Sequence, residues 1–364
     1  MFHLKLTALY DNLNIIWTIA VKDIIDAIKN KVVISMIVMS SLTLLVPRLL
    51  PLIFEQPEMA LPVYTSGDSQ TLAKLTNNPG ITVVKVDSEL ELRSALCGGI
   101  FPVIGLSVPA DIDSIISTSN QVVIPGYACW SWRFKTTSLK SSLEAVLTRT
   151  LGKPVIVNLD EHIVFPPQEG VLLLNITNIN AVLILLMMGI FLVPSLLLEE
   201  KETKTIQALL VSPASISQVV LGKTLAGVFY ILVTALVILT VSFAEVVHWE
   251  MALLFVGCGA FFSVAIGLLL GSLFDKQQDM VGWMTGLLLF LVGAILVQSL
   301  NMQVPIFVKQ ILPWLPSIAL ADICRSIYSE QVPSAQILFD VLDILVISLP
   351  IYAVVAWRIR RSDR

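Results

Sequence analysis

The chain has 364 residues, of which 56% are hydrophobic and 14% are charged, and its formal net charge is −4. Soluble globular domains carry roughly 25% charged residues, so this composition excludes an ordinary soluble protein and indicates a membrane protein. The sequence contains no basic tract that is long enough to bind nucleic acid. Its four cysteines lack CxxC spacing, so a zinc site or a thiol redox motif has no support.

The first predicted element is an amphipathic helix over residues 14–31, within a cytoplasmic N-terminus of residues 1–31. Isoleucine recurs there at near-helical spacing, with lysine and aspartate in between, and such a helix lies along the inner face of a membrane. The alternative is that the same apolar stripe packs against protein. A signal peptide is not expected, because charged residues precede the first hydrophobic run and that run begins late.

About 20 mostly apolar residues cross a bilayer whose hydrocarbon core is about 30 Å thick, and six segments of the chain meet this condition. They are residues 32–54, 171–198, 219–243, 251–274, 281–300 and 337–357. The predicted fold is therefore an α-helical polytopic membrane protein with about six transmembrane helices. An α/β extracytoplasmic domain, residues 55–170, is inserted between the first and the second helix.

Lysine and arginine gather on one side of these segments, which the positive-inside rule assigns to the cytoplasm. The residues on this side are Lys5, Lys22, Lys29, Lys31, Lys201, Lys204, Lys223, Lys276, Arg358, Arg360, Arg361 and Arg364. The short segments on the other side contain only Lys309, Arg325 and Arg48. We therefore expect a plasma-membrane protein with both termini in the cytoplasm and a basic cytoplasmic tail at residues 358–364.

Residues 55–170 have the composition of a soluble domain in which short strands and helices alternate. The predicted strands are residues 61–65, 81–86, 102–107, 121–124 and 155–158, and the predicted helices are residues 69–76, 88–96 and 136–151. Ser88 and Glu91 have the spacing of a capping box at the start of the second helix. The alternation predicts a small α/β domain.

Cys97 and Cys129 both lie in this outer domain. Outside the cell they can form a disulfide, and two separate buried thiols are the alternative that the sequence leaves open. His162 has no second metal ligand nearby, so we expect it to have a packing or surface role and no metal site to form.

The connection between the second and third membrane segments, residues 199–218, is expected to carry a short helix. A charged block at residues 199–202 ends the apolar run, and residues 203–210 then have an amphipathic pattern. A Ser-Pro pair at 212–213 breaks this helix. A short helix presented to the cytoplasm can bind a peripheral partner, and an ordinary connecting loop is the alternative.

The stretch from residue 199 to residue 223 resembles the signature loop of ABC type-2 exporter permeases. In that family an acidic cluster precedes a threonine-led run that ends in two leucines, followed by Ser/Thr-Pro and a Leu-Gly-Lys helix start. The matching residues, together with Glu199 of the charged block, are Glu200, Glu202, Thr205, Ile206, Gln207, Leu209, Leu210, Ser212, Pro213, Leu221, Gly222 and Lys223. Two positions depart from the family pattern, because Lys204 replaces its usual glycine and Gln207 replaces its glutamate.

The remaining elements follow the order of the same family. Residues 14–31 resemble its elbow helix, and residues 55–170 resemble the outer domain of its large-ectodomain branch. Residues 268–283 are similar to its Gly-Ser-x-Phe turn, and residues 311–327 to the segment with proline, aspartate and arginine before its last span. The resemblance thus extends over nearly the whole chain.

The resemblance implies the permease subunit of an ATP-binding-cassette exporter that moves an unidentified substrate. It implies a separate cytoplasmic ATPase that binds ATP and magnesium, and a second permease chain in a homodimer or heterodimer. Besides these partners the chain contacts the lipid bilayer, and no cofactor or nucleic acid is expected to bind it. Residues 221–224 read LGKT, but Ser217 stands where a P-loop requires glycine, so no ATPase site is expected.

Polar residues at membrane depth are candidates for a pathway or gate, because burying them is costly. Asn175 and Asn178 lie near the outer end of the second membrane segment. Asp340 and Asp343 lie one turn apart at the start of the sixth segment. Interfacial solvation or hydrogen bonding between helices is the alternative role for these four residues.

Two further patterns concern helix contacts. Asp322 and Arg325 are three residues apart and are expected to pair on one helix face, where they would stabilise a re-entrant segment. The GxxxG patterns at 267–271 and 282–286 allow close helix packing, within the chain or with a second chain.

Two other functions remain open at this point. A secondary transporter would use an ion gradient, and such folds often contain repeated halves with broken helices near mid-membrane, which this sequence does not show. A membrane-tethered sensor would bind a ligand with the outer domain, but it would not need six membrane segments.

Overall fold

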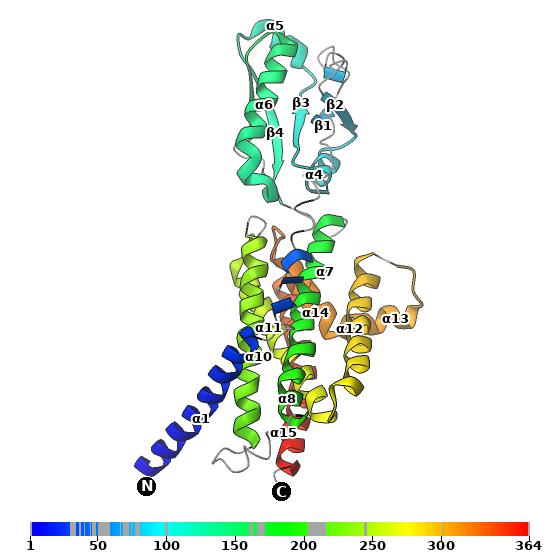
Figure 1. Ribbon diagram of the computed structural model, residues 1–364. Coiled ribbons are helices and arrows are strands. Elements are labelled where there is room, and N and C mark those ends of the chain that lie inside the picture. Colours follow the sequence, from blue (N-terminus) through cyan, green and yellow to red (C-terminus); the bar gives the residue numbers. More distant parts are fainter. Residues whose placement is uncertain are drawn as a thin grey trace.

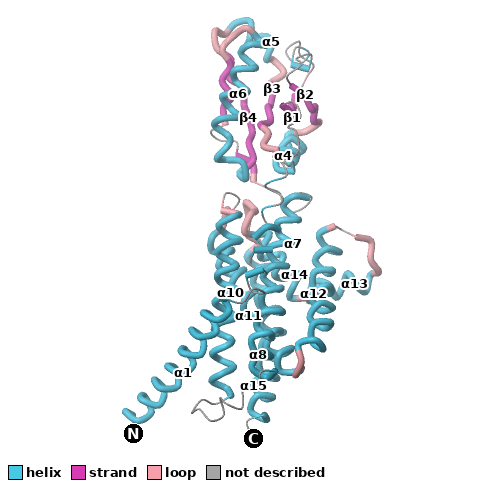
Figure 2. The backbone as a smooth tube through the Cα atoms, in the orientation of Figure 1, coloured by secondary structure: helices cyan, strands magenta, loops and turns pink. Residues whose placement is uncertain are grey.

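The structure, a computed structural model, describes most of the chain. The described residues are 2–29, 59–65, 67, 81–98, 101–159, 163–165, 172–202, 216–243, 246–300 and 302–362, with isolated positions between 34 and 49 and between 73 and 76. They form an α/β domain at one end of a bundle of long helices (Figure 1). Strands occur in the domain and helices make up the bundle (Figure 2).

The α/β domain is built on one six-stranded sheet in the described part of the chain. The strands are β1 (Met59–Thr65), β2 (Ile81–Val86), β3 (Ile104–Val108), β4 (Val122–Cys129), β5 (Val155–Asn158) and β6 (Ile163–Val164). Their order is β2-β1-β3-β4-β5, and β6 pairs with β4. Neighbouring strands are parallel except β3 and β4, which run antiparallel with Ile104 opposite Ala128.

Helices cover both faces of this sheet. The helices are α4 (Glu89–Gly98), α5 (Ile112–Thr118) and α6 (Arg133–Leu151). Leu143 and Leu147 of α6 are buried against one face with Leu106, whereas Leu92 and Leu96 of α4 are buried against the other. Apolar residues therefore leave water on both sides of the sheet, which is the main stabilising term for such a domain.

The Ser88 half of the capping box predicted at the start of α4 is present, whereas the Glu91 side chain bonds the amide of Asp87, one residue before the cap. The Ser88 Oγ atom accepts a hydrogen bond from the Glu91 amide at 3.1 Å, and Glu91 Oε2 accepts one from the Asp87 amide at 2.9 Å. The Cys97 and Cys129 side chains form a disulfide, with 5.4 Å between their Cα atoms, which ties α4 to the end of β4. The sequence had left this pairing open.

The five predicted strands are present, and the bounds of β1, β3 and β4 differ from the prediction. β4 continues to Cys129, past the predicted end at residue 124. A Cβ atom on Gly126 would lie 2.4 Å from Val157 Cγ1, so glycine allows β5 to pack against β4 beyond the predicted end of the strand. The short strand β6 was not predicted. His162 and most of the helix predicted at residues 69–76 lie outside the described residues.

Five helices of the bundle are long and apolar enough to cross a membrane, among the described residues. They are Thr177–Leu198, Gln218–Val241, Trp249–Leu273, Gln277–Ser299 and Ser334–Arg358. They lie in the combined helix α7 (Leu172–Met187), η2 (Met188–Leu192) and α8 (Val193–Glu202), and in α10 (Ile216–Val241), α11 (Trp249–Leu273), α12 (Gln277–Ser299) and α15 (Ser334–Ser362). Five of the six predicted membrane segments are thus confirmed, and the first, residues 32–54, lies largely outside the described residues.

A bent pair of short helices adds a sixth candidate crossing or a re-entrant loop. Its parts are α13 (Ile306–Ile311), η3 (Leu312–Trp314) and α14 (Pro316–Ser326), and the pair is bent by 69°. Pro316 begins α14, as its fixed φ and missing amide hydrogen favour. The sequence had suggested a re-entrant segment here.

Helix α11 occupies the middle of the bundle, in contact with α7, α8, α10, α14 and α15. Two of its glycines permit this arrangement. A Cβ atom on Gly259 would lie 1.8 Å from Leu185 Cδ2, and one on Gly267 would lie 2.3 Å from the Gly189 carbonyl oxygen, in the π-helical turn η2. The GxxxG pattern at 267–271 therefore serves packing within the chain. A Cβ atom on either glycine of the pattern at 282–286 would have no described atom within 4 Å.

The N-terminal helix α1 (Phe2–Lys29) is longer than the predicted amphipathic helix. It contacts α10 and diverges from the bundle toward its N-terminus, at the end away from the α/β domain (Figure 1). Leu13 and Trp17 are exposed on α1, whereas Ala20 is fully buried, so the helix has an exposed apolar face beside its docked face.

Candidate functional site

The candidate ATPase-coupling loop lies in the sequence between α8 and α10, and the end of α8 and the start of α10 lie at the end of the bundle away from the α/β domain (Figure 1). Glu199, Glu200 and Glu202 are in the last turns of α8, and nothing is described of their side chains. Six candidate residues of this loop lie outside the described residues: Thr205, Gln207, Leu209, Leu210, Ser212 and Pro213. The candidates whose surroundings are described are Gly222 and Lys223, which lie in α10.

A buried ion pair joins α10 to α1. Lys223 Nζ lies 3.2 Å from Asp23 Oδ2, and the two side chains are 3% and 8% exposed. A buried charge is tolerated only when it is paired and hydrogen-bonded, so each of these residues requires the other. The pair connects positions 200 residues apart in the sequence.

Other contacts support the ion pair along the same helix interface. A Cβ atom on Gly222 would lie 2.7 Å from Ile19 Cγ2, so glycine is what allows α1 to lie directly against α10. The Tyr230 hydroxyl donates a hydrogen bond to the Ile24 carbonyl oxygen. Helix α1 is thus fixed to the helix that follows the candidate coupling loop.

Sequence reasoning had placed Lys223 in the coupling loop and had not identified Asp23 as its partner. One signal was available, because a lysine that follows the start of an apolar membrane helix needs a nearby carboxylate or an interfacial position. Several acidic residues met that condition, and only the packing of α1 on α10 selects Asp23.

A polar cavity of about 130 Å³ lies near the other end of the bundle. Its lining comes from the end of α12, the end of α14 and the start of α15, namely Gln298, Asp322, Arg325, Ser326, Pro333, Gln336, Ile337 and Asp340. Arg325 Nη1 lies 2.8 Å from Asp322 Oδ1, as the spacing of these two residues predicted. Arg325 Nη2 also donates a hydrogen bond of 2.9 Å to Ser299 Oγ, which connects α14 to α12.

The structure brings only part of the predicted gate into this cavity. Asp340 lines it, and Asp343 lies one turn further along α15. The Oδ2 atoms of both aspartates are buried without a hydrogen-bond partner among the described residues. Asn178 is buried in the bundle, where its Nδ2 atom donates to the Ala321 carbonyl oxygen at 3.1 Å, and nothing is described of the Asn175 side chain.

Asn178 therefore has a packing role and does not line the cavity itself. Its hydrogen bond holds α7 against α14 at Ala321, directly before Asp322. The glutamines at 298 and 336 were not identified from the sequence. They lie on different helices and become neighbours only when α12 and α15 pack against α14.

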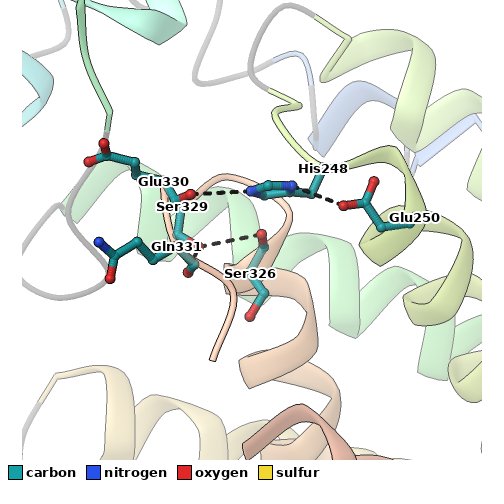
Figure 3. A network of polar contacts seen from close by, with 6 residues as sticks. All are labelled: His248, Glu250, Ser326, Ser329, Glu330 and Gln331. Atoms are coloured by element: carbon teal, nitrogen blue, oxygen red, sulfur yellow. Dashed lines mark hydrogen bonds and ion pairs between the residues drawn. The ribbon is translucent and has the colours of Figure 1, made fainter. Parts of the chain in front are cut away.

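A network of polar contacts holds the connection between α14 and α15 next to the loop between α10 and α11 (Figure 3). His248 Nδ1 lies 3.0 Å from Glu250 Oε1, and its Nε2 atom lies 3.4 Å from the Glu330 carbonyl oxygen. The amide of Val247 also donates to the Ile327 carbonyl oxygen at 2.9 Å. The segment that carries the polar cavity is thus attached to a neighbouring pair of membrane helices.

The described residues contain no group of three or more histidine, cysteine, aspartate or glutamate side chains arranged to hold a metal ion. At both sites the described side chains form ion pairs and hydrogen bonds. Such groups can couple helix positions or contact a polar solute.

The chain matches the family model described as ABC-2 family transporter protein over residues 32–358. This range includes the α/β domain, all the candidate membrane helices, the candidate coupling loop and the polar cavity. A comparison with curated proteins finds no match.

Proposed function

Because the chain belongs to the ABC-2 family of transporter proteins, and is a membrane permease without an ATPase of its own, we propose that it forms half of an ATP-driven exporter. The family assigns ATP hydrolysis to a partner subunit. Transport is outward, the chain is of the large-ectodomain branch, and a second permease chain completes the transporter. ATP and magnesium would bind to the partner subunit, and no substrate is assigned.

The proposed orientation has both termini in the cytoplasm of a plasma-membrane protein and the α/β domain outside. The bias of lysine and arginine supports this orientation. The disulfide between Cys97 and Cys129 is compatible with it, because disulfides persist in oxidising compartments. The loop between α8 and α10 then faces the cytoplasm, where an ATPase can reach it.

The observation that carries the proposal is the family match across residues 32–358. The sequence between α8 and α10 supports it, because it resembles the family's signature loop except at Lys204 and Gln207. We propose that residues 199–218 bind the ATPase and that its movement on ATP binding is transmitted to α10. The Asp23–Lys223 pair would transmit that movement to α1, since this buried ion pair joins α1 to α10.

The polar cavity is the proposed outer part of the pathway. It combines the carboxylates of Asp322 and Asp340 with one guanidinium and two amide side chains. A polar solute can exchange its hydrogen bonds with water for hydrogen bonds with such groups. Asp343, one turn further along α15 than Asp340, would be the next polar side chain of the gate that a solute meets.

The experiment is to isolate the chain together with the nucleotide-binding ATPase that remains bound to it, and to measure ATP turnover with and without the permease. We expect the permease to change that turnover. Glu202→Lys and deletion of Leu209 and Leu210 should each abolish the change, whereas Lys309→Ala, at the other end of the bundle, should preserve it. Stimulation that survives both coupling-loop changes would refute the assigned loop, and ATP hydrolysis by the permease alone would refute the class.

A further inference from the structure

The base of the α/β domain carries aromatic and basic side chains in alternation. β4 ends at Cys129, and the turn η1 (Trp130–Trp132) and the start of α6 follow it directly. The guanidinium carbon of Arg133 lies 4.1 Å from the ring centroid of Trp130 and 4.7 Å from that of Phe134. These are cation–π contacts, which hold the positive charge of Arg133 at the base of the domain.

Arg133 also connects the domain to the ends of two membrane helices. Its Nη2 atom donates a hydrogen bond of 3.4 Å to the Phe243 carbonyl oxygen, two residues after α10 ends at Val241. The ring of Phe243 lies 5.4 Å from that of Trp249, the first residue of α11. Figure 1 shows the start of α6 beside the ends of these two helices. The base of the domain therefore lies at the level where α10 and α11 leave the hydrocarbon core.

Four side chains at this level are exposed: Phe134, Lys135, Phe243 and Trp249, which we call the interfacial collar. The three aromatic residues are 67%, 53% and 43% exposed, and Lys135 is exposed beside the Trp132 ring, at 5.6 Å from its centroid. Glu250, the carboxylate next to Trp249, is 64% exposed, and its Oε1 atom lies 3.0 Å from His248 Nδ1 (Figure 3).

We propose that the interfacial collar binds the headgroups of anionic phospholipids in the membrane leaflet on the side of the α/β domain. Exposed aromatic side chains at the ends of membrane helices favour the headgroup region. A lysine at that level gains energy from anionic lipid. The bilayer is the fitting occupant because the collar is shared between the domain and two helix ends, at a depth where lipid headgroups surround the bundle.

The consequence is that the α/β domain is held against the membrane surface at its base. Arg133 joins the domain to the bundle, and Phe134 and Lys135 of the next two positions contact lipid. This inference depends on the placement of the domain over α10 and α11, and it is independent of the coupled ATPase and of the direction of transport.

The test is amide hydrogen exchange of the full chain in nanodiscs made of phosphatidylcholine alone or mixed with phosphatidylglycerol. The amides of the first two turns of α6 should exchange at least about fivefold more slowly in the anionic discs, the factor that one lysine supplies at an anionic surface. The double variant Phe134→Ala/Lys135→Ala should lose this difference. The matched control, Val84→Ala/Lys85→Ala, changes an exposed apolar residue and an exposed lysine on the far edge strand β2 and should keep it.

Equal exchange of the unsubstituted chain in the two lipids would overturn the proposal. So would a difference that persists in Phe134→Ala/Lys135→Ala. Because the substituted side chains are exposed, both variants should unfold at the same temperature as the unsubstituted chain, and this measurement separates loss of lipid contact from loss of the fold.

Discussion

The buried pair between Asp23 and Lys223 yields the most specific prediction. Replacing Asp23 with Asn leaves the Lys223 ammonium buried without its carboxylate, and replacing Lys223 with Met leaves the carboxylate without its ammonium. At 3.2 Å and an effective dielectric constant of about 20, the attraction between the two charges is about 5 kcal/mol. Breaking a buried pair by removing one partner costs about 3–5 kcal/mol. We expect each single variant to lose about that amount of unfolding free energy.

The double variant Asp23→Asn/Lys223→Met should recover most of this loss, because neither charge then remains buried alone. The assay is unfolding of the full chain in mixed detergent–SDS micelles, read as a double-mutant cycle. Lys22→Met is the matched control, since Lys22 precedes Asp23 on the same helix and is exposed. It should change the free energy by less than about 0.5 kcal/mol.

Two results would refute this reasoning. Single variants that behave like Lys22→Met would mean that the pair contributes nothing to stability. Additive losses in the double variant would mean that the two residues act independently, so the contact between α1 and α10 would not rest on their charges.

Three further predictions concern other contacts. Replacing Cys97 and Cys129 with Ser should destabilise the α/β domain by about 3–4 kcal/mol, because the unfolded chain is then no longer constrained by a loop of 32 residues. Thermal unfolding with and without reductant checks this. Burial raises the pKa of Tyr127 above its usual value of 10.0, so the stabilisation present at lower pH should fade as pH rises through that raised pKa. The loss of unfolding free energy above about pH 10 should be smaller in Tyr127→Phe than in the unsubstituted chain, and an equal loss in both would contradict this reasoning. Gly267→Ala places a Cβ atom 2.3 Å from the Gly189 carbonyl oxygen and should lower the unfolding free energy by at least about 1–3 kcal/mol. Gly257→Ala lies on the same helix with no described atom within 4 Å of the added Cβ and should not destabilise the chain. Equal stability of the two variants would refute the packing argument.

The length and pattern of apolar runs determined most of the architecture. A membrane helix satisfies its own backbone hydrogen bonds, so its existence depends on local composition, and five predicted segments are confirmed for that reason. The strands of the α/β domain were found in the same way, from short apolar stretches between turn residues. The prediction ended β4 at residue 124, before Gly126, whereas in the structure the strand continues through Gly126, which has no Cβ atom to collide with Val157.

The candidate sites were only partly determined by the sequence. The Asp322–Arg325 pair lies within one helical turn, so spacing alone predicted it. Asp340 was identified as a polar residue in an apolar segment. Gln298 and Gln336 were not identified, because they line the cavity only once α12 and α15 have packed against α14.

The tertiary structure alone decided which distant residues meet. Asp23 and Lys223 are 200 positions apart, and Arg133 reaches Phe243 across the boundary between the domain and the bundle. Local pattern reports which face of a helix is apolar, but it contains no information about which helix will cover that face. An unpaired buried charge is costly, so a buried lysine such as Lys223 requires a carboxylate on the helix that covers it. That cost arises only after the helices have packed.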